Sequence, residues 1–380
     1  MGPLKGFKIV EIAGIGPGQF CGMLLADMGA QIIRVDRPST VDLGIEMPAK
    51  YNLMNRSRAA IAVDLKTPEG VELVLRLCDD ADAIFEGYRP GVMERLGLGP
   101  RECLARNEKL IYGRVTGWGQ EGPLADTVGH DTNYIALSGV LAAIGDKNTS
   151  PPIPLNLIGD FGGGGVYLAM GMLAAMLETS KSGKGQVVDA AMVDGVASMM
   201  TMFYGMYAGG MWNDARQSNL LDGAAPFMHT YETKDGKFIA VCAIEKRFYK
   251  VLIETLAISE IDLTDQYNQS KWPEHEKILA TLFRSKSRDD WSDIFEGTDA
   301  CFAPVLSLTE APEHPHSQAR NSYLNVDGIQ QPAPAPRFSR TKSEIQNSPT
   351  EVGEFDQEVL ADWGLTDAEI ATYLQAGSAA

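Results

Sequence analysis

The first part of the chain alternates short apolar runs with segments of helical periodicity. Residues 8–13 (KIVEIA) and 31–35 (QIIRV) are typical of buried strands, and residues 19–28 between them have the apolar spacing of a helix. Nearly continuous apolar strands that alternate with helices are typical of a parallel sheet covered on both faces. The pattern therefore predicts that an α/β domain begins with a β-α-β unit.

A second unit of the same kind follows. Thr67 is placed to cap a helix that begins with Pro68 and carries Glu69 in its first turn, and the apolar residues 83–85 predict the next strand. A further strand is expected at residues 187–191, before a methionine-rich helix. The repeated alternation of strand and helix favours a sheet that is mainly parallel.

Four consecutive glycines, Gly162 to Gly165, stand between Asp160 and an apolar stretch that begins at Val166. The apolar stretch predicts a helix of about 13 residues. Because glycine has no Cβ, we interpret the glycine run as a turn that lets a backbone segment or a ligand come close. A carboxylate beside such a turn is either exposed to a ligand or caps the helix that follows.

The pattern changes near residue 222. Residues 229–233 and 238–242 alternate like strands and flank residues 234–237 (KDGK), which is a hairpin signal. Short helices and loops follow, and the proline-rich residues 331–336 are typical of a linker. We therefore predict a large Rossmann-like α/β domain with a linker helix over residues 1–224, a smaller α+β domain over residues 225–325, and a linker and C-terminal segment over residues 326–380 that returns to the large domain.

At 380 residues the chain is long enough for two domains, and its 44% hydrophobic and 22% charged residues are ordinary for a globular protein. No apolar run approaches the ~20 residues of a membrane-spanning helix, and no signal peptide is evident, so we expect a cytoplasmic protein without a membrane partner. The net charge of −17 argues against a nucleic-acid partner. Residues 1–115 hold equal numbers of acidic and basic residues, so a polyanionic ligand would meet the least repulsion there.

The glycine-containing turn at residues 14–18 invites a dinucleotide-binding interpretation, which the spacing does not support. A G-x-G-x-x-G motif requires glycine or alanine at position 19 or 21, and the chain has Gln19 and Cys21 there. The five cysteines have no C-x-x-C spacing and are expected to be reduced residues of the core. Neither a nicotinamide cofactor nor a metal site is expected.

Basic residues of the first half fall in predicted loops. They are Arg37, Arg56, Arg58, Arg89 and Arg95. Ligands of parallel α/β sheets lie at the carboxyl ends of the strands, so these side chains suit an anionic ligand. The alternative for each of them is a solvated surface charge.

His130 stands directly before an apolar helix, so its imidazole is expected near a helix N-terminus. A structural role for His130 and a capping role for Asp160 are the alternatives to catalysis. The methionines between Met192 and Met211 predict either a packed core helix or an adaptable apolar wall for long acyl chains.

Several extended motifs resemble those of the family III (CaiB/BaiF-type) coenzyme A transferases and, within that family, the racemases that act on 2-methylacyl-CoA thioesters. The motifs occupy residues 11–18, 34–38, 63–66, 86–92, 94–100, 116–120 and 129–131. The resemblance covers nearly the whole chain. It implies an interlocked homodimer, with a large domain that resembles a Rossmann fold without binding a dinucleotide and an active site that the partner's small domain completes.

The resemblance also implies roles for single residues. The acid/base pair of the racemases corresponds to His130 and Asp160, and an acidic residue of the small domain corresponds to Glu245. The coenzyme A contacts correspond to Arg37, Arg58, Val63, Asp64, Leu65, Lys66, Gly87, Tyr88, Arg89, Arg95, Gly129, Asp131 and Tyr134. Coenzyme A is part of the substrate, so no separate cofactor is expected.

Inverting a carbon next to a thioester carbonyl requires one base on each face of that carbon. His130, oriented by Glu245, would serve one face and Asp160 the other, through an enolate, and Asn156 and Tyr134 are expected to support the pair. In the transferases, the position of Asp160 carries a nucleophile that forms an acyl anhydride, and the Gly-His-Asp motif is missing. The motif therefore favours racemisation over coenzyme A transfer, and a non-catalytic acyl-CoA-binding protein is a third alternative.

Overall fold

The structure is a computed structural model that describes residues 2–38, 47–351 and 357–375. The chain divides into two compact units. Unit 1 comprises Met1–Ser138, Pro154–Met199 and Ala319–Ala380, and unit 2 comprises Gly139–Ile153 and Met200–Gln318. Unit 2 therefore includes residues 139–153 and 200–224, which the sequence assigned to the large domain. Arg216 links these segments by donating to the carbonyl oxygens of Asp146, at 3.0 Å, and Thr149, at 2.8 Å.

Unit 1 is built on a six-stranded sheet in which all neighbouring strands are parallel. Its strands are β1 (Lys8–Ile12), β2 (Gln31–Asp36), β3 (Ala59–Ala62), β4 (Ala83–Glu86), β5 (Ile111–Thr116) and β6 (Gln186–Ala191). The order β3-β2-β1-β4-β5-β6 reverses direction at β1, as in Rossmann folds. The predicted α/β class is confirmed, whereas β3 and β5 were not predicted from the sequence.

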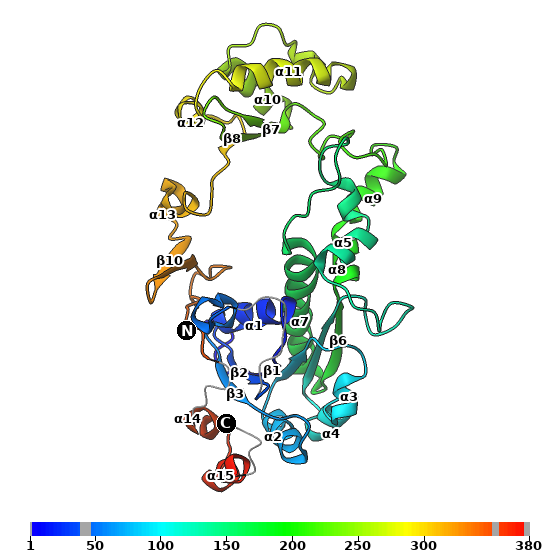
Figure 1. Ribbon diagram of the computed structural model, residues 1–380, viewed down its shortest axis with the longest axis vertical. Coiled ribbons are helices and arrows are strands. Elements are labelled where there is room, and N and C mark those ends of the chain that lie inside the picture. The colour runs from blue at the N-terminus through cyan, green and yellow to red at the C-terminus, as the bar shows by residue number, and fades with distance from the viewer. Residues whose placement is uncertain (1, 39–46, 352–356, 376–380) are drawn as a thin grey trace. The chain divides into compact units, whose positions relative to one another are not determined.

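Helices cover both faces of this sheet (Figure 1). Alternate strand residues point to opposite faces, so Val10 packs with α2 (Pro68–Asp79) in one core cluster and Ile9 with α1 (Pro17–Asp27) and α7 (Tyr167–Ser182) in another. The predicted cap of α2 is confirmed, because the Thr67 hydroxyl accepts from the backbone N–H of Gly70 at 3.1 Å. The remaining helices of unit 1 include α3 (Val92–Leu96), α4 (Pro100–Arg106), α5 (Asp131–Leu137), α8 (Met192–Met199), α14 (Gln357–Asp362) and α15 (Asp367–Gln375).

The prediction of a turn at Gly162 to Gly165 is wrong. These glycines lie within a π-helix, η3 (Leu157–Val166), which continues directly into α7. A Cβ on Gly163 would lie 2.6 Å from the Cγ2 of Val196 on α8, and one on Gly165 would lie 2.8 Å from the carbonyl oxygen of Pro17. The missing side chains therefore let η3 pack closely against α8 and α1.

The continuous helix Leu157–Ser182 is long and apolar enough to cross a membrane by length and composition alone. From the sequence we had expected no apolar segment of this length. In unit 1, however, Leu168, Met172 and Ala175 of this helix pack into the core beside the sheet. These contacts are those of a core helix of a globular protein.

The described residues 319–351 and 357–375 complete unit 1. They begin with a hairpin of β10 (Tyr323–Val326) and β11 (Ile329–Pro332), from which the side chain of Gln331 accepts a 2.8 Å hydrogen bond from Arg56. Further on, Trp363 is buried in the same core cluster as α2.

Unit 2 contains a three-stranded antiparallel sheet of β7 (Met228–Glu232), β8 (Phe238–Cys242) and β9 (Phe302–Pro304). The predicted hairpin between β7 and β8 is confirmed. The core of the unit is rich in aromatic side chains, among them Phe227, Tyr231 and Phe283. Its helices include α6 (Val140–Ala143), α9 (Thr201–Ala208), α10 (Lys246–Thr255), α11 (Trp272–Phe283), α12 (Arg288–Phe295) and α13 (Pro315–Ala319), the last of which ends at the border with unit 1.

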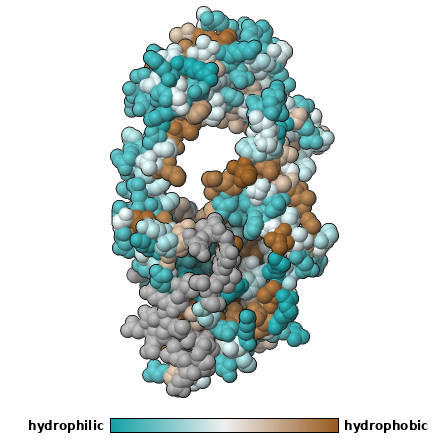
Figure 2. All heavy atoms as spheres, viewed as in Figure 1, coloured by the Kyte–Doolittle hydropathy of each residue, from teal (hydrophilic) through white to brown (hydrophobic). Residues whose placement is uncertain are grey.

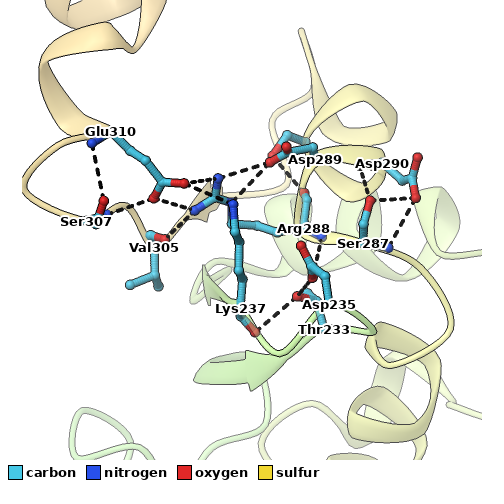
Figure 3. A network of polar contacts seen from close by, with 11 residues as sticks. Thr233, Asp235, Lys237, Ser287, Arg288, Asp289, Asp290, Val305, Ser307 and Glu310 are labelled. Atoms are coloured by element: carbon cyan, nitrogen blue, oxygen red, sulfur yellow. Dashed lines mark hydrogen bonds and ion pairs between the residues drawn. The ribbon is translucent and has the colours of Figure 1, made fainter.

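A network of charged groups connects the β7–β8 hairpin, the start of α12 and the segment after β9 (Figure 3). Arg288 donates to both carboxylate oxygens of Glu310, at 2.8 and 2.9 Å, and Lys237 donates to Glu310 at 3.0 Å. The carboxylate of Asp235 accepts from the backbone N–H of Arg288 at 3.1 Å. The hydrogen bonds from Arg288 hold the pKa of Glu310 well below its usual range. We call this set the Arg288 network.

The expectation that all five cysteines are core residues is wrong for two of them. Cys21, Cys78 and Cys103 are buried, but Cys242 and Cys301 are exposed. Cys242 is the last residue of β8, and its backbone N–H donates to the carbonyl oxygen of Cys301, just before β9, at 2.9 Å. The packed-core interpretation of the methionine segment also fails in part. Met199, Met202 and Met211 are exposed, and Figure 2 shows further apolar residues at the surface.

Candidate active site

The loops that follow the strands of unit 1 share one edge of the sheet, because the strands are parallel. The turn at residues 14–18 follows β1, Arg37 follows β2, and Val63 begins the loop after β3. The loop after β5 leads to α5, and the same connection later returns through η3 and α7 to β6. The candidate residues of unit 1 are therefore carried by segments that start at this carboxyl edge.

His130 occupies the N-cap position of α5, which confirms the prediction that it lies at a helix N-terminus. Its backbone N–H donates to the side-chain oxygen of Asn133 at 3.0 Å, which fixes the start of the helix. The imidazole belongs to an exposed residue. The turn therefore presents the ring of His130 outward from a backbone that is held in place.

Asp131, the next residue, points the other way. It is 4% exposed, and its Oδ2 accepts from the backbone N–H groups of Gly159, at 2.6 Å, and Asp160, at 2.8 Å. No sequence pattern indicated this contact, because 28 residues separate Asp131 from Gly159 along the chain. The Gly-His-Asp motif thus connects the turn of His130 directly to the segment that carries Asp160.

Asp160 lies in the first turn of η3 and is partly buried. Its Oδ2 accepts a hydrogen bond from the Asn156 side chain at 3.2 Å. Burial raises the pKa of Asp160 above its usual value, and the negative charge of Asp131 raises it further, whereas Asn156 and the positive charge of His130 lower it. Because Asp131 follows His130 directly and accepts from the backbone N–H of Asp160, the segments that carry His130 and Asp160 adjoin each other.

The turn at residues 14–18 proves to be part of the surroundings of Asp160. Gly16 has a φ of +65°, and a Cβ on it would lie 3.1 Å from the Oδ2 of Asp160. Phe20, four residues after Gly16, stacks on Phe161, the residue after Asp160, with the ring centroids 4.6 Å apart. The sequence excluded a dinucleotide at this turn but did not suggest its role, which is to leave room for a carboxylate from a distant segment.

Tyr134 supports the loop that ends at His130. Its hydroxyl donates to the carbonyl oxygen of Gly129, and its ring packs edge-on against Trp118 with the centroids 4.8 Å apart. Burial raises the pKa of Tyr134 to about 12. Because the side chain is 5% exposed and engaged inside the loop, its position does not support the expected contact with coenzyme A.

The basic residues expected at the ligand separate into two groups. Arg37, Lys66, Arg89 and Arg95 are exposed. The guanidinium carbon of Arg37 lies 5.1 Å from the ring centroid of Tyr88, and its Nε donates to the Tyr88 hydroxyl at 3.3 Å. The contact between Arg37 and Tyr88 joins the segments that follow β2 and β4.

Arg58 belongs to the interior. It is 1% exposed, forms an ion pair with Glu11 and donates to the Asn55 side chain at 3.0 Å. Arg56 is likewise buried, with a 2.6 Å ion pair to Asp27. Sequence reasoning could not distinguish these buried cations from surface ones, and the position of Arg58 does not support a direct contact with a phosphate.

The other expected contacts have mixed surroundings. Val63 is fully buried, and its backbone N–H donates to the carbonyl oxygen of Asp36 at 2.8 Å. Asp64 and Leu65 are partly exposed, Gly87 is exposed, and Gly129 is partly exposed. Their contacts with coenzyme A stay predictions.

Glu245 lies in unit 2, where it is exposed and directly precedes α10. Its relation to His130 therefore stays a prediction. Over residues 2–38, 47–351 and 357–375, no group of three or more His, Cys, Asp or Glu side chains is placed to hold a metal ion.

A parallel sheet in the order β3-β2-β1-β4-β5-β6, with the segments of His130 and Asp160 joined through Asp131 at its carboxyl edge, agrees with the family that the motifs suggested. The model of CoA-transferase family III matches residues 4–355. The chain belongs to this family.

Two similar proteins are named α-methylacyl-CoA racemase. The protein from Mus musculus is 43% identical over 371 residues, which cover 97% of this chain and 95% of the mouse protein. The protein from Homo sapiens is 40% identical over 372 residues, with the same coverage of both chains. A solved structure, that of a CAIB/BAIF family protein from Brucella suis, is 26% identical with a TM-score of 0.81, and the match covers 95% of this chain and 99% of that one.

Proposed function

We propose that this protein is a racemase that interconverts (2R)- and (2S)-2-methylacyl-CoA thioesters. The observation that carries the proposal is that Asp131, the residue after His130, accepts from the backbone N–H groups of Gly159 at 2.6 Å and Asp160 at 2.8 Å, which joins the segments of His130 and Asp160. Burial also raises the pKa of Asp160. A raised pKa suits a carboxyl group that must both accept and return a proton near neutral pH. Similarity to two proteins named α-methylacyl-CoA racemase, at 40 and 43% identity, supports the same reaction.

In the proposed reaction, one of the two side chains removes the α-proton and the other returns a proton to the opposite face. When the Asp160 carboxylate takes the proton, the electron pair of the C–H bond moves into the thioester carbonyl and gives an enolate. The imidazolium of His130 then protonates the α-carbon. The reverse direction uses the same groups with their proton states exchanged, which is why each must serve as both acid and base.

The coenzyme A part of the substrate would bind at the carboxyl edge of the sheet. The exposed cations there, Arg37, Lys66, Arg89 and Arg95, supply charge for its phosphates. Met199 lies within reach of the site, since its Cε would be 3.5 Å from a Cβ on Gly162. This exposed thioether suits an apolar wall for the acyl chain.

We further propose a homodimer in the cytoplasm. Large apolar side chains are exposed on α7 and α9, among them Met170, Leu177, Tyr204 and Tyr207, and exposed apolar surface of this kind suits an interface with a second copy. In that dimer, Glu245 of the partner would orient His130. The exposed free thiols of Cys242 and Cys301 suit a reducing compartment.

Proton exchange at the α-carbon tests the reaction directly. A 2-methylacyl-CoA incubated with the protein in D₂O should incorporate deuterium at the α-carbon and lose its optical purity, as NMR and chiral analysis would show. The His130→Ala variant should lose this activity. If it exchanges and racemises both epimers at the parent rate, His130 has no part in the mechanism.

The same assay, repeated with a free carboxylic acid, tests coenzyme A transfer. A transferase would pass coenzyme A to the acid through an acyl anhydride on Asp160, without deuterium uptake. A binding protein would retain the thioester and show neither reaction. Either result would overturn the proposed racemase.

A further inference from the structure

Asp131 joins the two segments that carry the proposed acid and base. Its Oδ2 accepts from two consecutive backbone N–H groups, those of Gly159 at 2.6 Å and Asp160 at 2.8 Å, while its own backbone follows His130 directly. A displacement of either segment would stretch these two short hydrogen bonds. The carboxylate is therefore a direct mechanical link between the His130 turn and the start of η3.

The negative charge of Asp131 needs an explanation beyond this link. The side chain is 4% exposed, and its second oxygen, Oδ1, is buried without a hydrogen-bond partner among the residues that the structure describes. A buried carboxylate with one unsatisfied oxygen is costly. An asparagine side-chain oxygen would accept the same two backbone hydrogen bonds without that desolvation cost, so stability alone does not account for a charged group here.

The charge does act on the neighbouring site. The negative charge of Asp131 raises the pKa of Asp160, because two carboxylates at short range disfavour each other's ionised forms. It also contributes to the raised pKa of Tyr134. A fixed charge therefore lies where it adjusts the proton equilibrium of the proposed base.

We propose that Asp131 is a positioning residue of the racemase, whose carboxylate sets the separation of His130 and Asp160 and supplies a fixed negative charge beside Asp160. This inference rests on the proposed function and adds a residue that acts through Asp160. The expected contact of Asp131 with coenzyme A is a separate prediction, which the position of its side chain does not support. A buried carboxylate that is occupied by two amides, and that would repel phosphates, is poorly suited to that contact.

Two substitutions separate the link from the charge. Asp131→Asn keeps an oxygen that can accept both backbone hydrogen bonds but removes the charge. Asp131→Ala removes both, and leaves the N–H groups of Gly159 and Asp160 without their acceptor. Because Asp131→Asn keeps the acceptor for both backbone hydrogen bonds, it should still fold if Asp131→Ala does not.

Asp82 offers a matched control within unit 1. Its carboxylate accepts from the backbone N–H of Lys8 at 2.8 Å, and burial raises its pKa, as burial does for Asp160. Asp82 directly precedes β4, so it lies at the amino edge of the sheet, opposite the proposed site. Asp82→Asn and Asp82→Ala report on the loss of a similar hydrogen-bonded carboxylate away from the catalytic pair.

For Asp131→Ala we expect kcat for racemisation to fall by roughly 100-fold, because a small displacement of one catalytic group can cost that much. KM should change by less than about threefold, since binding energy shared by substrate and transition state is not removed. A raised KM with an unchanged kcat would show that Asp131 contacts the substrate and would overturn the proposal. A kcat at the parent level would show that the hydrogen bonds of Asp131 do not position His130 and Asp160.

For Asp131→Asn we expect the pKa of Asp160 to fall, because the like charge is gone. The acid limb of the kcat profile should move to lower pH, and ¹³C NMR titration of labelled aspartate carboxyl groups in the free protein should show the same shift. An unmoved Asp160 titration in Asp131→Asn would overturn the role of the charge. Both Asp82 variants should keep the parent's acid limb and Asp160 titration.

The NMR titration does not depend on turnover. If the parent protein fails to exchange the α-proton, the proposed function fails even if the Asp160 titration moves as expected. If the parent racemises but the Asp131 variants show neither change, only the positioning role fails.

Discussion

Two carboxylates in this protein have opposite surroundings. Glu310 in unit 2 accepts hydrogen bonds from Arg288, Lys237 and the backbone N–H of Ser307, and its pKa is held well below the usual range (Figure 3). Asp160 in unit 1 accepts one hydrogen bond from Asn156, is partly buried, and has a raised pKa. The Arg288 network keeps its carboxylate ionised, whereas the surroundings of Asp160 leave it ready to exchange a proton.

Glu86 shows that an ion pair alone does not decide the outcome. It accepts from Arg114 at 3.0 Å and from the backbone N–H of Tyr88 at 2.6 Å, yet burial raises its pKa to about 7. The cost of removing a charge from water exceeds the gain from one cation in the interior, and the balance reverses near the surface. A low pKa at Glu310 thus reflects solvent exposure as well as several donors.

The largest change in activity is expected from Asp160→Asn, which removes the proposed base but keeps a similar shape. Racemisation should fall by roughly 10²- to 10⁴-fold, the range typical of general acid–base groups. Chiral analysis of a 2-methylacyl-CoA would measure this loss, and the affinity for coenzyme A should be nearly unchanged. A variant that racemises at the parent rate would show that the raised pKa of Asp160 has no catalytic meaning.

A smaller loss is expected from Gly16→Ala. The new Cβ would crowd the Asp160 carboxylate at 3.1 Å and would require a non-glycine residue at a φ of +65°. We expect kcat to fall by roughly tenfold and the free energy of unfolding to fall by about 1–3 kcal/mol.

Gly6→Ala separates these two effects of the Gly16 substitution. Gly6 has a φ of +93°, but a Cβ there would meet nothing within 4 Å. Its substitution should lower stability, measured by thermal unfolding, without lowering kcat per folded molecule. Equal losses of kcat in the two variants would mean that crowding of Asp160 is unimportant.

In the Arg288 network, Glu310→Gln should lower stability in a pH-dependent manner. Because the folded protein holds the pKa of Glu310 below its ordinary 4.5, its contribution is fully present above that value and is lost as the pH falls below it. Hydrogen exchange of β8 and α12 should therefore differ between variant and parent at pH 7, and the difference should shrink in acid. Glu296→Gln, at an exposed carboxylate of the same unit, should show no such dependence.

The smallest effect is expected from Asn156→Ala. The Asn156 side chain stabilises the ionised form of Asp160, so its removal raises the pKa of Asp160 further. The acid limb of the kcat profile should then move to higher pH, the direction opposite to that of Asp131→Asn. A limb that stays in place would show that this hydrogen bond is not made in solution.

The sequence predicted the strands that are rich in branched apolar residues and the cap at Thr67, because these depend on neighbours along the chain. It missed β3, which contains three alanines in four residues, and β5, which contains Gly113 and Arg114, because the parallel pairing that stabilises them comes from distant strands. The glycine run failed as a predicted turn for the same reason, since its role depends on α1 and α8.

The candidate site divides in the same manner. His130 and Asp160 could be selected from their local sequence and the family motifs. The burial of Arg58 beside Glu11 and the crowding of Asp160 by Gly16 could not, because each depends on a segment that is far away in the sequence. The double acceptance by Asp131 across 28 and 29 residues is of this kind as well.

The path of the chain has a consequence for synthesis on the ribosome. Unit 2 uses no residue beyond Gln318, so all of it has been translated before unit 1 is complete. The hydrogen bond from buried Arg56 to Gln331 cannot form until Gln331 has been translated, and the core beside α2 is incomplete until Trp363 has been translated. A nascent chain would therefore expose an unfinished apolar face of unit 1 until Trp363 has been translated, and chaperones have reason to bind that face during this interval.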